Sequence, residues 1–409
     1  MGMEAQRQEA LQNNQNKKRS NISAILEVLC VSTKLGLSSF GGPIAHLGYF
    51  HNEYIQRRKW MDERSYADLV ALCQFLPGPA SSQVGIGIGL IRAGIWGGIV
   101  AWIGFTLPSV IALVAFAFLL KGFDIGNAGW IHGLKIVAVA IVSQAILGMG
   151  QKLTPDRNRI TIAVIVAGLS LLWQTAYSQV LLILVAGLIG VWFYRSTKVE
   201  QAPQLPITIS RSFAVSCLLM YVALLLTLPL LRQWGQSDGL AWFDSFYRSG
   251  SLVFGGGHVV LPLLEQEVVP TGWVSKADFL AGYGAAQAVP GPLFTFSGYL
   301  GAMAGGISGA AIAVIAIFLP AFLLVAGALP FWNNLRNNPT IQGALTGVNA
   351  AVVGLLLAAL YDPLWITAIV QPADFALAAL LFILLVFWKL PPWMVVLAGA
   401  AGGMLIGLV

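Results

Sequence analysis

Two groups of glycine and proline residues interrupt apolar segments of this chain, and each group occurs twice. FGGP at 40–43 recurs as FGGG at 254–257, and PGP at 77–79 recurs as PGP at 290–292, so the second copies follow the first at almost the same offset. A helix break leaves backbone N–H groups without intrahelical partners. Those at the start of the next half-helix carry partial positive charge and can hold an anion without a charged side chain. The breaks therefore predict an anion-binding site.

The glycines and polar residues beside the four breaks are the candidate binding residues. Glycine lets the backbone approach a ligand closely, and hydroxyl and amide groups add hydrogen-bond donors. Pro79 and Pro292 are expected in the first turn of the following half-helices, where a missing N–H costs nothing. The alternative is that the breaks only kink membrane helices. The candidates are Gly41, Gly42, Gln74, Gly78, Ser81, Ser82, Gly255, Gly256, Gln287, Gly291 and Thr295.

Lys135 is a further candidate because it lies inside an apolar stretch, where a charge is costly enough to need a reason. Its counterpart at the matched position of the second half is the neutral Asn349. Lys135 would offset the charge of an anionic substrate, and Asn349 would make the site electrically asymmetric. In the alternative interpretation, Lys135 extends along the helix to the outer membrane interface.

Two charged pairs also match between the halves. Lys34 and Arg248 each lie six residues before the FGG motif, and Glu53 and Glu267 follow them at the same spacing. The basic residues either face a cavity or form structural ion pairs with the two glutamates, and the ion pair is favoured. Glu53 and Glu267 are the matched acidic residues, which makes them candidates for proton coupling; a solvated or salt-bridged role is the alternative.

Catalytic and cofactor chemistry finds no support in the sequence. The histidines show no metal-ligand spacing, the three cysteines are scattered in apolar segments, and the phosphate-loop motif G-x-x-x-x-G-K-[ST] is absent. We therefore expect no enzyme activity, no catalytic residues, no metal and no cofactor. The residues concerned are His46, His51, His132, His258, Cys30, Cys73 and Cys217.

The elements that must position these residues are membrane helices. Hydrophobic residues make up 57% of the 409 residues and charged residues only 10%, whereas soluble domains carry about 25% charged residues. Many apolar stretches approach bilayer-spanning length. The sequence thus predicts an all-α, polytopic integral membrane protein. The net charge of +6 is explained by basic residues beside the spans rather than by nucleic-acid binding.

The repeat predicts a chain of two halves. Residues 1–20 form a polar tail, 21–195 the first repeat, 196–234 a linker with one inverting helix, and 235–409 the second repeat. Each broken pair is expected to form a helical hairpin that enters and leaves on one side of the membrane. The expected helical segments are 21–38, 42–56, 65–76, 80–92, 94–120, 131–151, 160–176, 178–195, 211–232, 235–252, 257–270, 277–289, 292–304, 307–330, 340–360, 374–388 and 391–409.

The charges predict that the two repeats have opposite orientations. The segment 51–64 is rich in Arg and Lys, whereas its counterpart 264–276 has Lys276 as its single basic residue, with Glu265 and Glu267. By the positive-inside rule, the first segment faces the cytoplasm together with the N-terminus, and the second faces outward. We expect an inverted repeat in the plasma (inner) membrane. Full spans in place of some re-entrant half-helices are the alternative.

FGGP at 40–43, QFLPGP at 74–79, FGGG at 254–257 and VPGP at 289–292 together resemble the chromate ion transporter (CHR) family in its long, two-half form. The resemblance covers nearly the whole chain after about residue 22 and departs from the family pattern at the FGGG motif. It implies transport of chromate, with sulfate as the similar oxyanion, and usually efflux that confers chromate resistance.

The resulting hypothesis is a secondary active transporter of tetrahedral oxyanions that works by alternating access, the two halves rocking around the hairpin tips. Its partners would be chromate or sulfate, protons and the lipid bilayer, with no nucleic acid; a homodimer, the direction of transport and the coupling ion are left open. The alternatives are a sulfate permease of the same fold, a hairpin-based scramblase of anionic lipids, and an anion channel.

Overall fold

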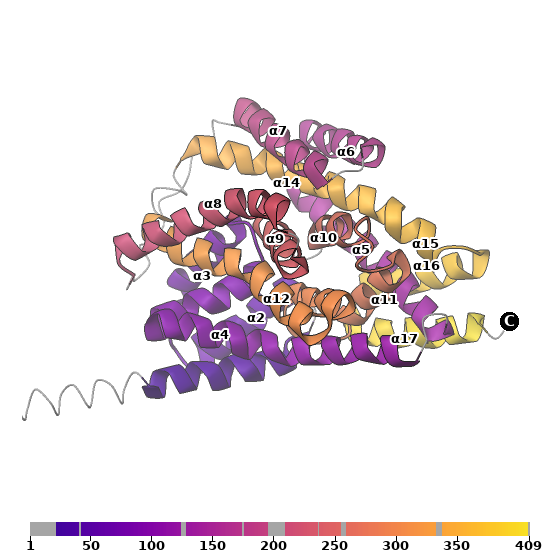
Figure 1. Cartoon of the computed structure of the whole chain (residues 1–409), viewed down its shortest axis with the longest axis horizontal. Helices are drawn as coiled ribbons and strands as arrows, with labels where there is room; N and C mark the ends of the chain where they lie inside the picture. The colour runs from indigo at the N-terminus through magenta and orange to yellow at the C-terminus, as the bar shows by residue number, and fades with distance from the viewer. Residues whose placement is uncertain are drawn as a thin grey trace, which may run out of the picture.

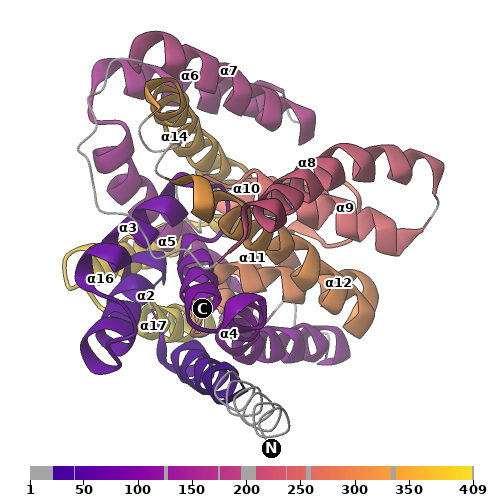
Figure 2. The same cartoon turned by 90° about the vertical axis from the view of Figure 1, so that its left-hand side faces the viewer.

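The computed structural model describes residues 22–40, 42–123, 128–173, 176–194, 209–235, 237–254, 259–332 and 338–407. All regular secondary structure in these ranges is helical, so the predicted all-α fold is confirmed. The helices α6, α7 and α14 run together along one edge of the molecule, and α4 and α17 lie along the opposite edge (Figures 1 and 2).

The first half follows the predicted order of elements. A helix over residues 22–38 precedes the first break, and most later boundaries lie close to those predicted from the sequence. The elements that follow are α2 (Gly42–Phe50), the π-helix η1 (His51–Arg57), α3 (Glu63–Phe75), α4 (Ala80–Phe123), α5 (Gly129–Leu153), α6 (Arg157–Leu172) and α7 (Ala176–Tyr194).

The second half repeats this order after one connecting helix, α8 (Arg211–Trp234). Its elements are α9 (Asp238–Ser251), α10 (Val260–Val268), α11 (Lys276–Ala286), the 3-10 helix η3 (Leu293–Thr295), α12 (Phe296–Ala328), the 3-10 helix η4 (Leu329–Phe331), α14 (Pro339–Ala359), the π-helix η5 (Leu360–Trp365), α15 (Ile366–Ala368), α16 (Pro372–Val386) and α17 (Pro392–Ile406).

Side-chain caps fix several helix starts. Asp156 accepts a hydrogen bond from the backbone N–H of Arg159 at the start of α6, and Ser275 accepts one from Asp278 at the start of α11. Such caps satisfy N–H groups that have no partner within the helix. Pro79 and Pro292 both lie one residue before their helices begin, not in the first turn as predicted.

The helix after each PGP motif bends sharply at a matched position. Ala93 and Gly94 have φ/ψ values of −141°/22° and 65°/−156°, and Gly305 and Gly306 have −140°/24° and 65°/−148°. The two bends occupy equivalent places in the repeat and are nearly identical in conformation. Only glycine adopts such a positive φ at little cost. The same glycine-dependent bend therefore occurs in both halves.

The two halves are interleaved through close backbone packing. α5 packs on α17, and α14 packs on α7, so the corresponding helix of each half lies against the last helix of the other half. A Cβ atom on Gly133 would collide with the carbonyl oxygen of Gly399, and one on Gly347 would collide with that of Ala186. Neither half is wrapped around a core of its own.

The outer surface is apolar, as a lipid-facing surface must be. In the described ranges five helices are long and apolar enough to cross a membrane, within 80–122, 129–153, 211–234, 293–331 and 339–368. Large apolar side chains such as Leu172, Trp192 and Trp234 are about 85% exposed, far more than a water-soluble surface tolerates as a continuous patch. The protein is a multi-pass membrane protein.

Candidate functional site

Two backbone hydrogen bonds join the four helix breaks in crossed pairs. The N–H of Gly78, in the first PGP motif, donates to the carbonyl of Val253 at 2.7 Å, and the N–H of Gly291, in the second, donates to the carbonyl of Ser39 at 2.8 Å. Each half's PGP motif thus binds the segment next to the other half's FGG motif. We call the residues 39–40, 77–79, 252–254 and 287–292 the break junction.

Glycine is required at the two donor positions. Gly78 and Gly291 have φ values of +120° and +99°, in the region that side chains with a Cβ rarely adopt. A Cβ on Gly78 would lie 3.0 Å from Nε2 of Gln83, and one on Gly291 would lie 2.8 Å from Oγ of Ser109. The N–H groups of both glycines are occupied by protein carbonyls, so they are structural donors in this conformation rather than free donors for an anion.

Free polar atoms surround the junction instead. Most buried polar atoms in proteins have a hydrogen-bond partner, because an unpaired one costs about 1–3 kcal/mol. Several side chains next to the breaks have a buried atom with no partner, which favours a polar ligand or water at this place. These atoms are Ser39 Oγ, Ser82 Oγ, Gln83 Oε1, Thr106 Oγ1, Gln287 Nε2 and Ser297 Oγ.

The hydroxyl candidates fall into two groups. Ser82 is buried with an unpartnered hydroxyl, as an anion-binding residue would be. Ser81 lies 3.3 Å from Nδ1 of His46, and the hydroxyl of Thr295 donates to the carbonyl of Pro292 at 2.7 Å. Ser81 and Thr295 therefore already have protein partners.

The amide and glycine candidates differ between the halves. Gln287 places an unpartnered Nε2 in the interior, whereas Gln74 is exposed. Gly42 begins α2 with φ +79° and has open space around it. The remaining candidates Gly41, Gly255 and Gly256 lie outside the described residues.

The structure does not join Lys135 and Asn349 to each other or to the junction by any hydrogen bond in the described ranges. Lys135 is half-buried on α5, next to Leu134, whose carbonyl oxygen lies against Gly284 of α11. Asp278 is the carboxylate that acts electrostatically on Lys135. Asn349 is half-buried on α14, two residues after the packing contact at Gly347.

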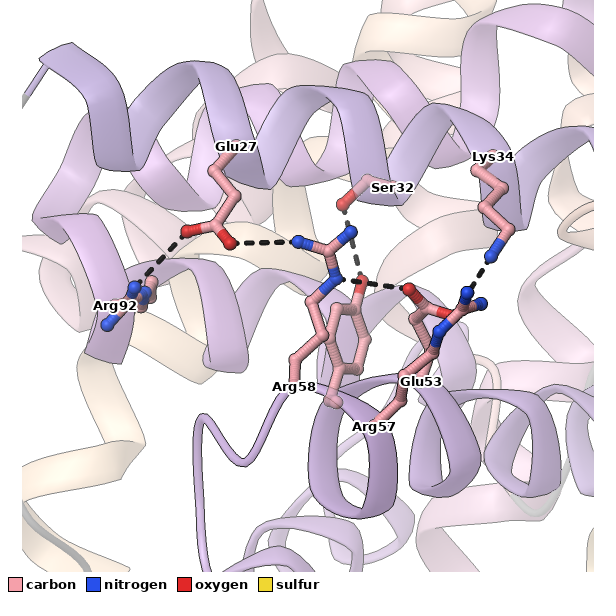
Figure 3. A network of polar contacts seen from close by, with 8 residues as sticks. Glu27, Ser32, Lys34, Glu53, Arg57, Arg58 and Arg92 are labelled. Carbon is pink, nitrogen blue, oxygen red and sulfur yellow. Dashed lines mark hydrogen bonds and ion pairs between the residues drawn. The ribbon is translucent and has the colours of Figure 1, made fainter.

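The matched charges of the first half form an ion cluster, so the favoured structural interpretation is confirmed for Lys34 and Glu53. Lys34 Nζ lies 3.0 Å from Glu53, which also binds Arg58 at 3.1 Å and Arg57 at 3.4 Å. Arg58 continues to Glu27 at 2.8 Å, and the cluster ends at Arg92 (Figure 3). It ties η1 to the helix over residues 22–38.

The second half repeats this pair with deeper burial. Arg248 lies 3.0 Å from Glu267 and 2.9 Å from Asp244, and the three side chains are 13%, 10% and 1% exposed. Arg232 adds a contact to Asp244 at 3.3 Å and lies over the ring of Trp273. The matched sequence positions 34/53 and 248/267 therefore form matched ion pairs.

The two proposed coupling carboxylates differ in their electrostatics. Burial raises the pKa of Glu53, but hydrogen bonds from Lys34 and Arg58 outweigh it, so the pKa lies below its ordinary value. Burial also raises the pKa of Glu267, and there Arg248 only partly offsets it, so the pKa lies above its ordinary value. Glu267 is therefore the easier of the two to protonate.

Four polar residues in or beside the junction were not predicted as site residues from the sequence. Ser39 precedes the first break, Gln83 follows the first PGP motif by four residues, and Thr106 and Ser109 lie in the span after the bend. Ser109 donates to the carbonyl of Thr106 at 3.0 Å and lies next to Gly291. The signal available was polarity within an apolar span, at Thr106 and Ser109 on either side of Pro108. Among the described residues no cluster of three or more His, Cys, Asp or Glu side chains could hold a metal.

Comparison with known proteins gives the same family as the motifs. A chromate transport protein of Pseudomonas aeruginosa is 28% identical over 347 residues, which is 82% of this chain and 80% of the relative. One of Cupriavidus metallidurans is 28% identical over 92% of this chain and 90% of the relative. An uncharacterized transporter of Methanocaldococcus jannaschii is 27% identical over 84% and 85%. No solved structure matches the chain. The chromate transporter family profile matches residues 26–191 and 240–404, and the chain, with its doubled break motifs, belongs to that family.

Proposed function

We propose that this protein is a secondary transporter that carries chromate, and sulfate as a similar tetrahedral dianion, across the plasma membrane. The observation that carries the proposal is the break junction, where the two halves meet and buried hydroxyl and amide groups stand without partners. The relatives named as chromate transport proteins support chromate as the substrate.

Neutral donors suit this substrate class. A dianion buried in a membrane protein needs several hydrogen bonds to replace its water shell. The hydroxyls of Ser82 and Ser297 and the Nε2 of Gln287 supply such donors from both halves. A site without a fixed cation binds an anion loosely enough to release it, which transport requires.

The interleaved halves support alternating access. In this proposal the halves have opposite orientations, and they rock around the junction so that the site opens first to one side and then to the other. The crossed bonds at Gly78 and Gly291 keep the four breaks together during the movement. The direction in the cell would be efflux, with the N-terminus in the cytoplasm.

The test is counterflow in proteoliposomes. Vesicles that contain the purified protein are loaded with unlabelled chromate and placed in labelled chromate; accumulation of label, absent from protein-free vesicles, is the expected result. Competition by external sulfate but not by chloride would define the substrate class. Flipping of a fluorescent anionic lipid without anion counterflow would contradict the proposal and support a scramblase.

A further inference from the structure

A polar cavity of about 240 Å³ lies between the second half and the last two helices of the first half, outside the break junction. It is lined by α6, α7, α10, α14 and η5 and by the start of α11. Its polar lining consists of Ser170, Gln179, Glu265, Gln266, Lys276 and Asp362. A cavity this polar between membrane helices needs a function, because apolar packing would be more stable there.

Three features of the cavity favour a ligand that forms hydrogen bonds with its polar lining. Lys276 Nζ is paired with Asp362 across it. Glu265 is half-buried, and its carboxylate makes no hydrogen bond or ion pair with the described part of the chain. Gln179 is only 2% exposed and has an unpartnered Oε1, and its Nε2 makes only a long contact of 3.5 Å to Pro262.

A second void adjoins both the cavity and the break junction. This smaller void shares Gln179 and Gln266 with the cavity and is also lined by Arg248, Glu267 and Leu252. Leu252 is the first residue of the break whose Val253 carbonyl binds Gly78. A line of polar groups thus leads from Glu265 to the junction.

We propose that Glu265 is a proton-binding residue of this cavity, and that an oxyanion occupies the cavity only when Glu265 carries a proton. The dependence of oxyanion binding on Glu265 rests on the proposed function, and the proton site itself does not. Glu265 is distinct from the matched carboxylates Glu53 and Glu267, which are both held in ion pairs.

The charges of the cavity explain the dependence. Lys276 is neutralised by Asp362, and Arg248 and Arg232 together neutralise Glu267 and Asp244, so an ionised Glu265 leaves a net negative charge that repels a dianion. A protonated Glu265 removes that charge and offers an O–H donor. Burial raises the pKa of Glu265 to about 7; Lys276 lowers it and Asp362 raises it. Apart from Glu265, Lys276 and Asp362, no ionisable group lines the cavity in the described ranges.

The first half places a titratable pair at the matched positions. In the register of the repeat, His51 corresponds to Glu265 and Glu63 corresponds to Lys276. His51 Nε2 lies 2.9 Å from Glu63, so the pair has the opposite arrangement of charge: a basic group where the second half has Glu265, and an acidic group where it has Lys276. An ionisable side chain therefore occupies the same position in both repeats.

The first arm of the test needs no transport. Infrared spectra of the protein in lipid vesicles are recorded across a pH series for wild type and Glu265→Gln, and the difference isolates the carboxyl band of residue 265. A midpoint near 7 is expected. Asp362→Asn frees Lys276 to stabilise the ionised carboxylate and should move the midpoint to lower pH. A midpoint at the ordinary carboxyl value of 4.5 would overturn the proton site.

The second arm measures exchange of labelled sulfate between pH values of about 5.5 and 8.5, which bracket the midpoint. Sulfate is used because chromate itself gains a proton in this range. Wild-type exchange should fall about tenfold for each pH unit above 7, Glu265→Gln should be flat, and the exposed control Asp238→Asn should follow wild type. A Glu265→Gln profile equal to wild type would overturn the anion requirement. Absence of all exchange, with the infrared midpoint still near 7, would count against the proposed function and the anion requirement alike and leave the proton site standing.

Discussion

At the scale of single residues, two glycines hold the junction together. Gly78 and Gly291 adopt positive φ values and donate to carbonyls of the other half. The sequence predicted the importance of these residues but not their partners, since a crossed hydrogen bond between segments in different halves of the chain leaves no local pattern. Those carbonyls occupy the N–H groups that the sequence predicts as anion donors.

Gly78→Ala and Gly291→Ala should each weaken the protein and its transport. Each substitution strains a positive-φ backbone, at a cost of about 1–3 kcal/mol, and pushes the new Cβ against Gln83 or Ser109. The expected result is a lower thermal unfolding midpoint in detergent together with reduced chromate counterflow. Gly148→Ala is the control, because that glycine lies in α5 with open space around it. A Gly78→Ala or Gly291→Ala protein as stable and active as the control would be inconsistent with this role.

At the scale of elements, the matched ion pairs show how equivalent sequence positions come to differ in their contribution to the free energy of unfolding. Lys34 is 53% exposed, and its partner Glu53 would still be paired with two arginines if Lys34 were replaced. Arg248 is 13% exposed and forms ion pairs with two buried carboxylates. The pairing could be predicted from the matched positions in the two repeats, whereas the difference in burial comes from helices that pack around Arg248 from elsewhere in the chain.

Arg248→Met should therefore destabilise the protein much more than Lys34→Met. Removal of one partner from a buried ion pair costs about 3–5 kcal/mol, whereas an exposed pair contributes about 0–1 kcal/mol. Thermal unfolding of both variants in the same detergent measures the difference. Equal losses would mean that Asp244 and Glu267 are reached by water and do not need Arg248.

At the scale of the whole molecule, the repeat, the helix boundaries and the membrane class could all be predicted, because apolar periodicity and Gly-Pro breaks are local signals. The interleaving of the halves could not be predicted, because nothing in the sequence distinguishes Gly133 and Gly347, which make the close contacts, from other small residues. The polar cavity beside Glu265 could not be predicted either, because its lining comes from six elements that only the fold brings together.

The proposed opposite orientation of the halves can be tested with single cysteines. In a background in which Cys30, Cys73 and Cys217 are replaced, Gln56→Cys and Thr271→Cys place exposed thiols in the two matched loops. A membrane-impermeant maleimide added outside intact cells should label position 271 and not position 56. Lys152→Cys is the control, since its basic surroundings predict the same side as position 56. Labelling of positions 56 and 271 from one side would contradict the inverted repeat.

The most direct test of the central claim compares chromate counterflow by wild type, Ser82→Ala, Ser297→Ala and the double variant, with Ser216→Ala as a control at an exposed serine of α8. Each unpartnered hydroxyl is expected to contribute a charge-assisted hydrogen bond of about 1.5–3 kcal/mol, so each single variant should lose about tenfold or more in apparent affinity for chromate and the double variant more than either. Unchanged counterflow affinity in the double variant would show that chromate does not bind at the break junction.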